Sequence, residues 1–374
     1  MRDPAATVSD VLAALDRLAP SHLCLDGDPR GLLVGDPGAE VSRLVVALDV
    51  TPAVAATAER LGAQMAIAHH PLIYHPLRAV RADEPHPGGV VLSCIRAGVA
   101  VACAHTNWDV APGGVNDVLA ALLGLEDVRP LQTTYRELLV KVAVFVPTEN
   151  RAAVLEAMAN VGAGAIGDYD RCGFWAEGTG TFRPLPGARP HVGTVGAAET
   201  VNESRLEMIA PESRWRAVVD AMIAAHPYEE VAYDVYPLKN VAREFGIGRV
   251  GTLPAPLAPD ALLARVQAAL SFDAVRLVGP ADHTVRTVAV CGGAGAFLLP
   301  DALAAGADAL VTSDVRHHEF VDAESRGFLL LDAGHAATET PGARELARRL
   351  AADLAPSGVA VTFVDSDGGI AQTG

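Results

Sequence analysis

The chain has 374 residues, of which 50% are hydrophobic, 20% charged and 5% aromatic, a composition typical of a soluble globular protein with layered α/β packing. Its formal net charge of −16 disfavours a protein that binds nucleic acid or anionic membranes. There is no Cys-x-x-Cys motif, no secretory leader pattern and no long uncharged apolar run, so we expect a reducing, cytoplasmic location. Cys94, Cys103 and Cys291 lie in apolar segments and are interpreted as small core residues.

Helices and strands alternate along the first third of the chain. An amphipathic pattern predicts a helix from Ser9 to Leu18 with Ser9 as its N-cap, and Thr51 followed by Pro52 marks the start of a second helix. Apolar runs between the helical patterns predict buried strands. The predicted strands are 41–50, 65–71 and 101–109, and the further helices are 88–100 and 113–125. This alternation is typical of a mostly parallel sheet covered on both faces.

The pattern changes near Glu137, where apolar and polar residues alternate as in a half-buried strand. The order from there is strand, helix, turn-rich hairpin, strand, helix and strand, which predicts a small α+β module of the ferredoxin-like type with an antiparallel sheet. The predicted segments are 137–147, 148–162, 172–193, 204–211, 212–227 and 230–238.

After Gly248 the alternation of helices and strands resumes. Helices are expected at 259–270, 297–306 and 343–354, and strands at 284–293, 307–314, 328–335 and 359–366. We therefore expect an α/β fold in which one α/β/α layered domain with a mostly parallel sheet is interrupted by the inserted module. Residues 1–136 and 239–374 are the two halves of that domain, and residues 137–238 are the module.

Four of the predicted strands end in clusters of His, Asp and Glu residues. In open α/β sheets, ligands bind beyond the carboxyl ends of the parallel strands. We therefore expect these clusters to converge although they lie far apart in the sequence. The clusters are His69 with His70, His105 with Asp109, Asp314 with His317 and His318, and Asp332 with His335 and Glu339.

Each cluster taken alone also has a simple structural explanation. The His-His-Pro run at 69–71 is typical of a turn, and Asp109 is suited to cap the helix that follows. His335 and Glu339 are four residues apart, which places both on one face of a helix, either as an exposed pair or as two ligands. Pro341 follows closely and favours only a turn or a kinked helix start at this point.

Together the clusters favour a metal site, because imidazole nitrogens and carboxylate oxygens suit Zn, Mn, Fe or Co. The adjacent His69 and His70 do not easily reach one ion from a regular strand, since alternate side chains point to opposite faces. At a strand end, each histidine is free to serve a different ion. This favours a two-metal site, in which ions about 3.5–4 Å apart share a bridging carboxylate or water.

These motifs resemble those of the dinuclear-metal GTP cyclohydrolase 1 type 2 homologues, the Nif-three-like family, in its long form with a central module. The resemblance rests on "HHP", "HTNWD", "SDVRHHE" and "DAGHAATE", which occur in the family's order, and on "GTGTFRPLPGARPHVG" and "HPYEEVAYDVYPL" in the module. It spans nearly the whole chain. One departure is that the family's Trp-Asp-Asn before Gly-Leu is replaced here by "LDGDPR" before Gly31 and Leu32, which bears on the rim of the site.

The resemblance implies two divalent metal ions per chain and a toroidal homohexamer with the metal sites facing an inner cavity. One ion is expected on the first histidine of the pair and the aspartate, the other on the two remaining histidines, with the glutamate between them. By position, the family's ligands fall on His69, His70, Asp109, His335 and Glu339.

Three further histidines are candidate pocket residues. We expect His105 to orient Asp109 or the strand end. His317 and His318 either line the pocket or satisfy local backbone groups. The glycine-rich "CGGAGAF" at 291–297 is interpreted as a close-packed strand-to-helix turn and less favourably as an anion site.

Two functions remain open at the level of sequence. The first is a metal-dependent hydrolase that acts on a nucleotide- or pterin-like small molecule through water activated by the metal ions, since no Ser or Cys nucleophile motif is present. The family name implies cyclohydrolase chemistry. The alternative is a non-catalytic metal-binding regulatory or scaffold hexamer that binds a metabolite or a partner.

Overall fold

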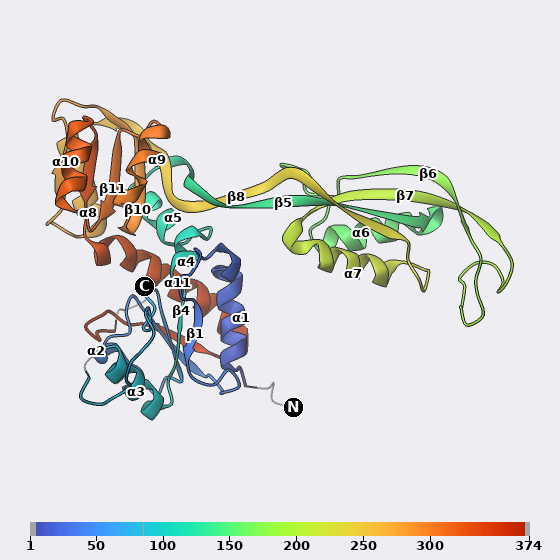
Figure 1. The fold of residues 1–374 in the computed structure, drawn as a ribbon, viewed down its shortest axis with the longest axis horizontal. Helices are drawn as coiled ribbons and strands as arrows, with labels where there is room; N and C mark the ends of the chain where they lie inside the picture. The colour runs from blue at the N-terminus through green and yellow to red at the C-terminus, as the bar shows by residue number, and fades with distance from the viewer. Residues whose placement is uncertain (1–4, 85, 371–374) are drawn as a thin grey trace. The chain divides into compact units, whose positions relative to one another are not determined.

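The chain forms two compact units in the computed structural model, which describes residues 5–84 and 86–370. One unit comprises Met1–Tyr135 with Phe245–Gly374, and the other comprises Arg136–Glu244. The chain passes between the units in two long strands, β5 (Glu126–Pro147) and β8 (Tyr233–Leu257) (Figure 1).

The first sheet of the larger unit has five strands in the order β1-β4-β3-β2-β13. Their bounds are β1 Gly31–Val34, β2 Arg43–Ala47, β3 Met65–Ala68, β4 Ala100–Cys103 and β13 Ala360–Phe363. Strands β13, β2, β3 and β4 are parallel, and only β1 runs antiparallel. The residues of β3 and β4 are buried on both faces, as the continuous apolar runs in the sequence predict.

A second set of strands in this unit follows the order β8-β10-β11-β12-β9. The bounds are β9 Arg276–Val278, β10 Val285–Ala294, β11 Ala309–Ser313 and β12 Leu329–Asp332. Strands β10, β11 and β12 are parallel, and β8 and β9 flank them antiparallel. The α/β class is confirmed, but the strands of the larger unit divide between two sheets, whereas the sequence analysis assumed one.

Helices cover both faces of each sheet and divide the core into layers. On the five-stranded sheet, α1 and α11 share one apolar cluster and α2 and α3 another. Helix α11 also packs against β10 and β11, so one helix contributes to the cores of both sheets. The helices are α1 Val8–Leu18, α2 Pro52–Arg60, α3 Gly88–Ala97, α4 Thr106–Val110, α5 Val115–Leu122, α8 Pro259–Leu270, α9 Leu299–Ala304, α10 His317–Ser325 and α11 His335–Leu354, with short 3-10 turns η1 Ser21–Leu23, η4 Ala296–Leu298 and η5 Ala355–Ser357.

The smaller unit has the order β5, α6, β6, β7, α7, β8 and the sheet order β6-β7-β5-β8. This is the βαββαβ arrangement of ferredoxin-like modules. β6 pairs antiparallel with β7, and β7 with β5, while α6 and α7 pack on one face of the sheet. The bounds are α6 Arg151–Asn160, β6 Gly173–Phe182, β7 Glu199–Pro211 and α7 Trp215–Ala225, with 3-10 turns η2 Thr148–Asn150 and η3 Glu212–Arg214.

Of the two helix starts predicted from the sequence, one N-cap is confirmed and the other is wrong. Thr51 caps α2 with Pro52 at its start, as predicted. The cap of α1 is Thr7 and not Ser9, because the Thr7 hydroxyl and the Asp10 carboxylate form a reciprocal capping box.

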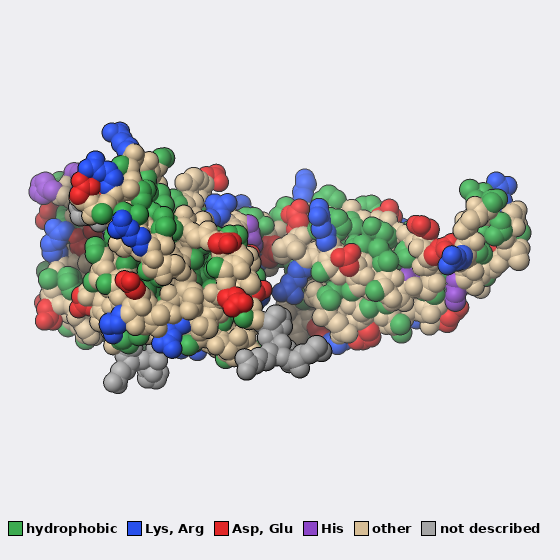
Figure 2. Space-filling model, turned by 90° about the horizontal axis from the view of Figure 1, so that it is seen from below, with side chains coloured by type: hydrophobic (Ala, Val, Ile, Leu, Met, Phe, Trp, Pro, Cys, Tyr) green, Lys and Arg blue, Asp and Glu red, His purple; other side chains and the backbone are tan. Residues whose placement is uncertain are grey.

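The cysteines and the molecular surface agree with the composition. Cys94, Cys103 and Cys291 are buried free thiols, which confirms their interpretation as core residues. On the face seen in Figure 2, basic and acidic side chains are interspersed. Within the described residues, no helix combines the length and the apolar character needed to cross a membrane.

Candidate metal centre

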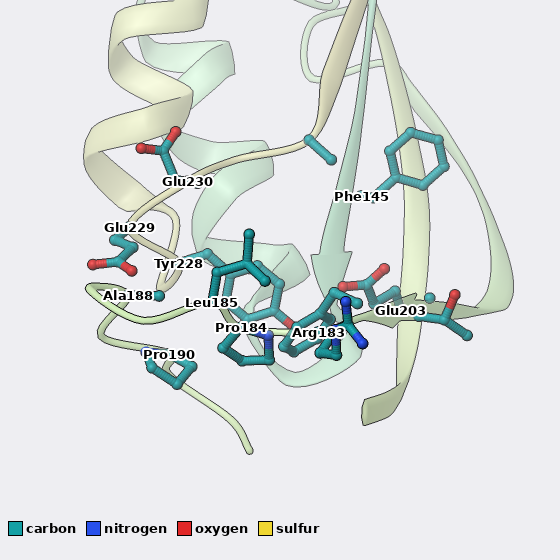
Figure 3. A pocket seen from close by; sticks show the side chains of 14 residues that line it. Phe145, Arg183, Pro184, Leu185, Ala188, Pro190, Glu203, Tyr228, Glu229 and Glu230 are labelled. Carbon is teal, nitrogen blue, oxygen red and sulfur yellow. The ribbon is translucent and has the colours of Figure 1, made fainter. Parts of the chain in front are cut away.

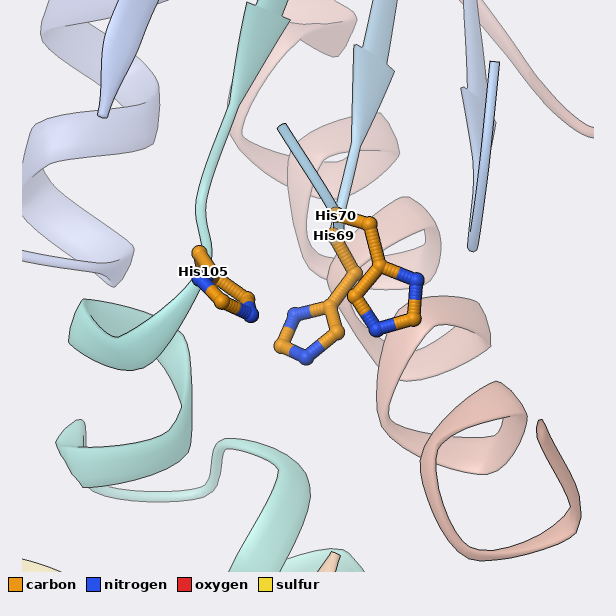
Figure 4. A group of neighbouring side chains, drawn as sticks. All are labelled: His69, His70 and His105. Carbon is orange, nitrogen blue, oxygen red and sulfur yellow. The ribbon is translucent and has the colours of Figure 1, made fainter. Parts of the chain in front are cut away.

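The histidines that follow β3 and β4 lie next to one another. These strands are parallel neighbours with Ala68 paired to Cys103, so the chain leaves both strands at the same edge of the sheet. His69 and His70 therefore lie close to His105 (Figure 4). The ring centroid of His105 is 5.3 Å from that of His69 and 5.6 Å from that of His70. One ring nitrogen from each histidine lies within 4.8 Å of the others, a spacing that could hold a metal ion.

Helix α11 brings two further residues to the same place. His335 is its first residue and Glu339 lies one turn later, with Nε2 and Oε2 separated by 3.0 Å. Pro341 does not end the helix, so the expectation of only a turn is wrong. The helix continues to Leu354, since the apolar face of its later turns is buried, and this burial outweighs a cost of about 3 kcal/mol for an internal proline.

Asp109 reaches the group from the short helix α4. It is only 7% exposed, and its Oδ1 lies 3.5 Å from Nε2 of His69. Asp109 does not cap the next helix, because the N-cap of α5 is Gly114. The carboxylate is therefore turned inward toward the histidines.

The Glu339 carboxylate lies between two sets of partners. Oε1 is 3.7 Å from Nε2 of His69. Oε2 is 2.9 Å from Nε2 of His70 and 3.0 Å from Nε2 of His335. Two ligands held about 2.0–2.2 Å from one ion, at angles of about 90–120°, are roughly 2.8–3.8 Å apart. All three separations fall in that range.

Buried polar atoms without partners show that the residues fit a metal ion. In the described part of the chain, Nε2 of His69, Oδ1 of Asp109 and Oε2 of Glu339 are buried and make no hydrogen bond. Oε2 of Glu339 is close to two ring nitrogens, but not in hydrogen-bonding geometry. Unpaired buried polar atoms cost free energy, and a cation among them removes that cost. The donor set of imidazole and carboxylate suits divalent Zn, Fe, Mn or Co.

Three carboxylates outside the group hold the histidines by their other ring nitrogen. Nδ1 of His70 donates to Asp49 at 2.8 Å, and Nδ1 of His335 donates to Asp314. His69 uses a backbone acceptor instead, with its Nδ1 3.0 Å from the carbonyl of Ala104. Such contacts fix the tautomer that turns Nε2 toward a metal.

The third of these carboxylates, Asp28, accepts from Nδ1 of His105 at 2.9 Å. His105 was expected to orient Asp109 or the strand end, and the hydrogen-bond partner of its Nδ1 is Asp28. Sequence reasoning missed Asp28 and Asp49. Asp49 lies two residues after the last residue of the buried strand β2, so the rule that found the other strand-end clusters would have found it.

The charges of the group shift the pKa values of its members. The pKa of His335 rises to about 9, chiefly because the Glu339 carboxylate, 3.0 Å from Nε2, favours the protonated ring. Burial opposes a charge on His70, but Asp49 and Glu339 outweigh it and raise the pKa to about 10. Burial raises the pKa of Asp109 to about 6 against the pull of His69. In the absence of metal, protons supply the positive charge that this cluster of carboxylates attracts.

The glycine-rich end of β10 forms a wall of the group. Gly293 has φ +64°, and a Cβ at this position would lie 2.1 Å from Oε1 of Glu339. The Gly293 amide donates to Oγ1 of Thr338, on the helix that carries Glu339. Close packing is therefore one reason for a glycine at this position, as expected. The group packed against it is the Glu339 carboxylate.

His317 and His318, the most conspicuous pair in the sequence, are not brought to the group. Both are exposed on the first turn of α10. No interaction links either side chain to the five candidate ligands in the described part of the chain. Asp314, three residues before the first residue of this helix, makes the contact to His335 instead.

A family comparison covers nearly the whole chain. The model of the Duf34/NIF3 (NGG1p interacting factor 3) family matches residues 6–368. The chain belongs to the Duf34/NIF3 family. Every residue of the candidate centre lies inside the matched range, as does the smaller unit Arg136–Glu244.

Curated Duf34/NIF3 relatives named "GTP cyclohydrolase 1 type 2 homolog" are similar over most of the chain. The Bacillus subtilis protein is 42% identical over 325 residues, which are 87% of this chain and 87% of the relative. The Mycobacterium leprae protein is 42% identical over 341 residues, 90% of this chain and 88% of the relative. A crystal structure titled as a Bacillus cereus protein related to NIF3 is 38% identical, with a TM-score of 0.88 and coverage of 96% and 97% of the two chains.

Proposed function

We propose that this protein binds two divalent metal ions and uses them to hydrolyse a nucleotide- or pterin-like small molecule. The observation that carries the proposal is the position of the Glu339 carboxylate, which turns one oxygen to His69 and the other to His70 and His335. A carboxylate placed in this way is suited to bridge two ions.

In this proposal, His69 and Asp109, 3.5 Å apart, would hold the first ion. His70 and His335, with their Nε2 atoms 3.1 Å apart, would hold the second. Glu339 would be shared between the two ions. The physiological metal is one of Zn, Fe, Mn or Co, which this donor set accepts.

When bound, such ions lower the pKa of a coordinated water to about 7 and polarise an oxygen of the substrate. The chain's own residues orient the site. Asp49 and Asp314 hold the Nδ1 protons of their histidines. His105, bound to Asp28 through Nδ1, lies beside His69 and His70 with its other nitrogen available to take or give a proton.

The substrate class follows from the name of the curated relatives, GTP cyclohydrolase 1 type 2 homolog, which implies attack of water on a purine-like ring. Six copies assemble into a toroid in the cytoplasm, as the family resemblance implies. Analytical ultracentrifugation tests the assembly, because a hexamer has six times the chain mass of 38.7 kDa.

Metal analysis of freshly purified protein tests the centre. About two ions per chain are expected for the wild type, and nearly none for the His69→Ala/His70→Ala double variant. His318→Ala is the matched control, since this exposed histidine should leave the metal content unchanged. A wild-type protein that holds no metal after incubation with Zn, Fe, Mn and Co contradicts the proposal.

Activity of the loaded protein on nucleotides, pterins and phosphoesters tests the reaction. Hydrolysis that disappears in His70→Ala and survives in His318→Ala is the expected result. A loaded protein that binds one of these compounds tightly in calorimetry without turning it over supports the alternative, a non-catalytic metal-binding assembly.

A further inference from the structure

A cavity of about 500 Å³ lies entirely within the unit Arg136–Glu244, apart from the candidate metal centre. Residues of β5, β6 and β7 form one side, and the segments after β6 and before β8 form the other (Figure 3). The walls are mainly apolar, and Phe145, Phe182, Pro184, Leu185 and Tyr228 contribute to them. This size and lining match those of small-molecule sites.

Among the described residues, neither the Glu203 carboxylate nor the Tyr228 hydroxyl in this cavity has a cationic partner. The carboxylate of Glu203 is half-buried, yet it forms no ion pair among residues 5–84 and 86–370. The hydroxyl of Tyr228 is buried and makes no hydrogen bond within the same residues. The two groups are close enough for the Glu203 charge to act on the Tyr228 hydroxyl. The two groups act on each other, but no cation among the described residues neutralises the Glu203 carboxylate, so a bound cation that also contacts Tyr228 is stabilised.

The backbone makes room for the Glu203 carboxylate. A Cβ at Gly180, on the paired strand β6, would lie 2.0 Å from Oε2 of Glu203. Only a glycine at this position lets the carboxylate lie across the strand in its present place. Gly180 and Glu203 both line the cavity, so the missing side chain at Gly180 leaves room for the acidic group at the cavity wall.

The charge and the rings of the lining define the kind of ligand. The lining contains three carboxylates, those of Glu203, Glu229 and Glu230, but only one basic side chain, that of Arg183. The resulting negative potential attracts cations. The rings of Phe182 and Tyr228 have centroids 6.0 Å apart, and such faces attract both flat rings and ammonium groups.

We propose that this cavity binds a small organic cation, a protonated amine carried on a flat apolar ring. The ammonium group pairs with the carboxylate of Glu203 and donates to the hydroxyl oxygen of Tyr228. The ring packs against Phe182, Pro184 and Leu185. The site belongs to the module and is independent of hydrolysis at the metal centre.

Calorimetry with the full-length, metal-loaded protein tests the site, with tryptamine as the cationic probe and indole-3-acetate as its anionic counterpart. Tryptamine is expected to bind at least ten times more tightly than indole-3-acetate. Glu203→Gln, which preserves the shape of the side chain, should weaken tryptamine binding at least tenfold. Glu156→Gln is the matched control: this carboxylate pairs with Arg171 outside the cavity, and the variant changes the net charge equally.

A second variant separates the site from a general charge effect. Gly180→Ala keeps every charge but displaces the Glu203 carboxylate, so it should weaken tryptamine binding as well, with an unchanged circular dichroism spectrum. Equal binding of both probes, or tryptamine binding that is insensitive to Glu203→Gln, overturns the proposal. Neither outcome depends on whether the metal centre is loaded or active, because the metal content of each variant is measured separately.

Discussion

Nε2 of His335 lies 3.1 Å from Nε2 of His70, a residue 265 positions earlier in the chain. Both rings donate their Nδ1 protons to carboxylates, so their remaining nitrogens face each other. Two lone pairs at this distance repel unless a cation lies between or beside them. A proton between the two rings removes this repulsion, and the metal ion proposed for these two nitrogens would remove it as well.

Glu339→Gln should lower the metal content from about two ions per chain to one or fewer. The amide has nearly the same shape as the carboxylate but lacks the charge that two cations share. Mass spectrometry of the metals checks this, with circular dichroism to verify the fold. Glu345→Gln, on the same helix but paired with Arg348, should keep both ions. Two ions retained by Glu339→Gln would show that the carboxylate is not the bridge.

Gly293→Ala should also reduce metal binding, because the new Cβ would meet Oε1 of Glu339 at 2.1 Å. The control is Gly306→Ala. Gly306 has a similar φ of +73° but nothing within 4 Å of the added carbon, so it reproduces the backbone strain without the clash. Metal titration of both variants distinguishes the two effects. An equal loss of affinity would mean that strain alone is responsible.

Asp49→Asn should weaken metal binding about 10- to 100-fold, as is typical when the carboxylate behind a ligating histidine is lost. The amide oxygen of the variant carries no full negative charge, so it accepts the hydrogen bond from Nδ1 of His70 more weakly than the carboxylate does. Competition with a metal-binding dye measures the affinity. Asp353→Asn, which removes a surface carboxylate paired with Arg17, should have no effect. Unchanged affinity in Asp49→Asn would leave Asp49 with no role in orienting His70.

Glu345 should contribute to stability in a pH-dependent manner. Hydrogen bonds from Arg348 and Arg349 lower its pKa from 4.5 to about 2, so its contribution is present above pH 4.5 and is lost as the pH falls to 2. Because the Arg348 side chain is 66% exposed, we expect only about 1 kcal/mol. Denaturant unfolding of wild type and Glu345→Gln should differ by this amount at pH 7 and converge near pH 2. A difference that grows on acidification contradicts the assignment.

Local patterns in the sequence were sufficient for the class of fold and for most of the elements, but not for β1, α4, β9 and α10. The helical pattern of α1 and the apolar run of β3 depend on periodicity within a few residues. Finer details failed where two neighbouring residues compete, as Thr7 and Ser9 do for the cap of α1. The one-sheet expectation failed because an apolar strand carries no mark of the sheet that it joins.

The sequence by itself determined which polar residues follow buried strands, and the family resemblance selected five of them as ligands. Only the tertiary structure decided which strand ends meet. It brought Asp314 to His335 and left His317 and His318 exposed, although all lie within one short stretch. The physical reason is that a side chain's neighbours depend on strand order, on the parallel register of β3 with β4 and on the direction of α11, and these are set by packing between segments hundreds of residues apart.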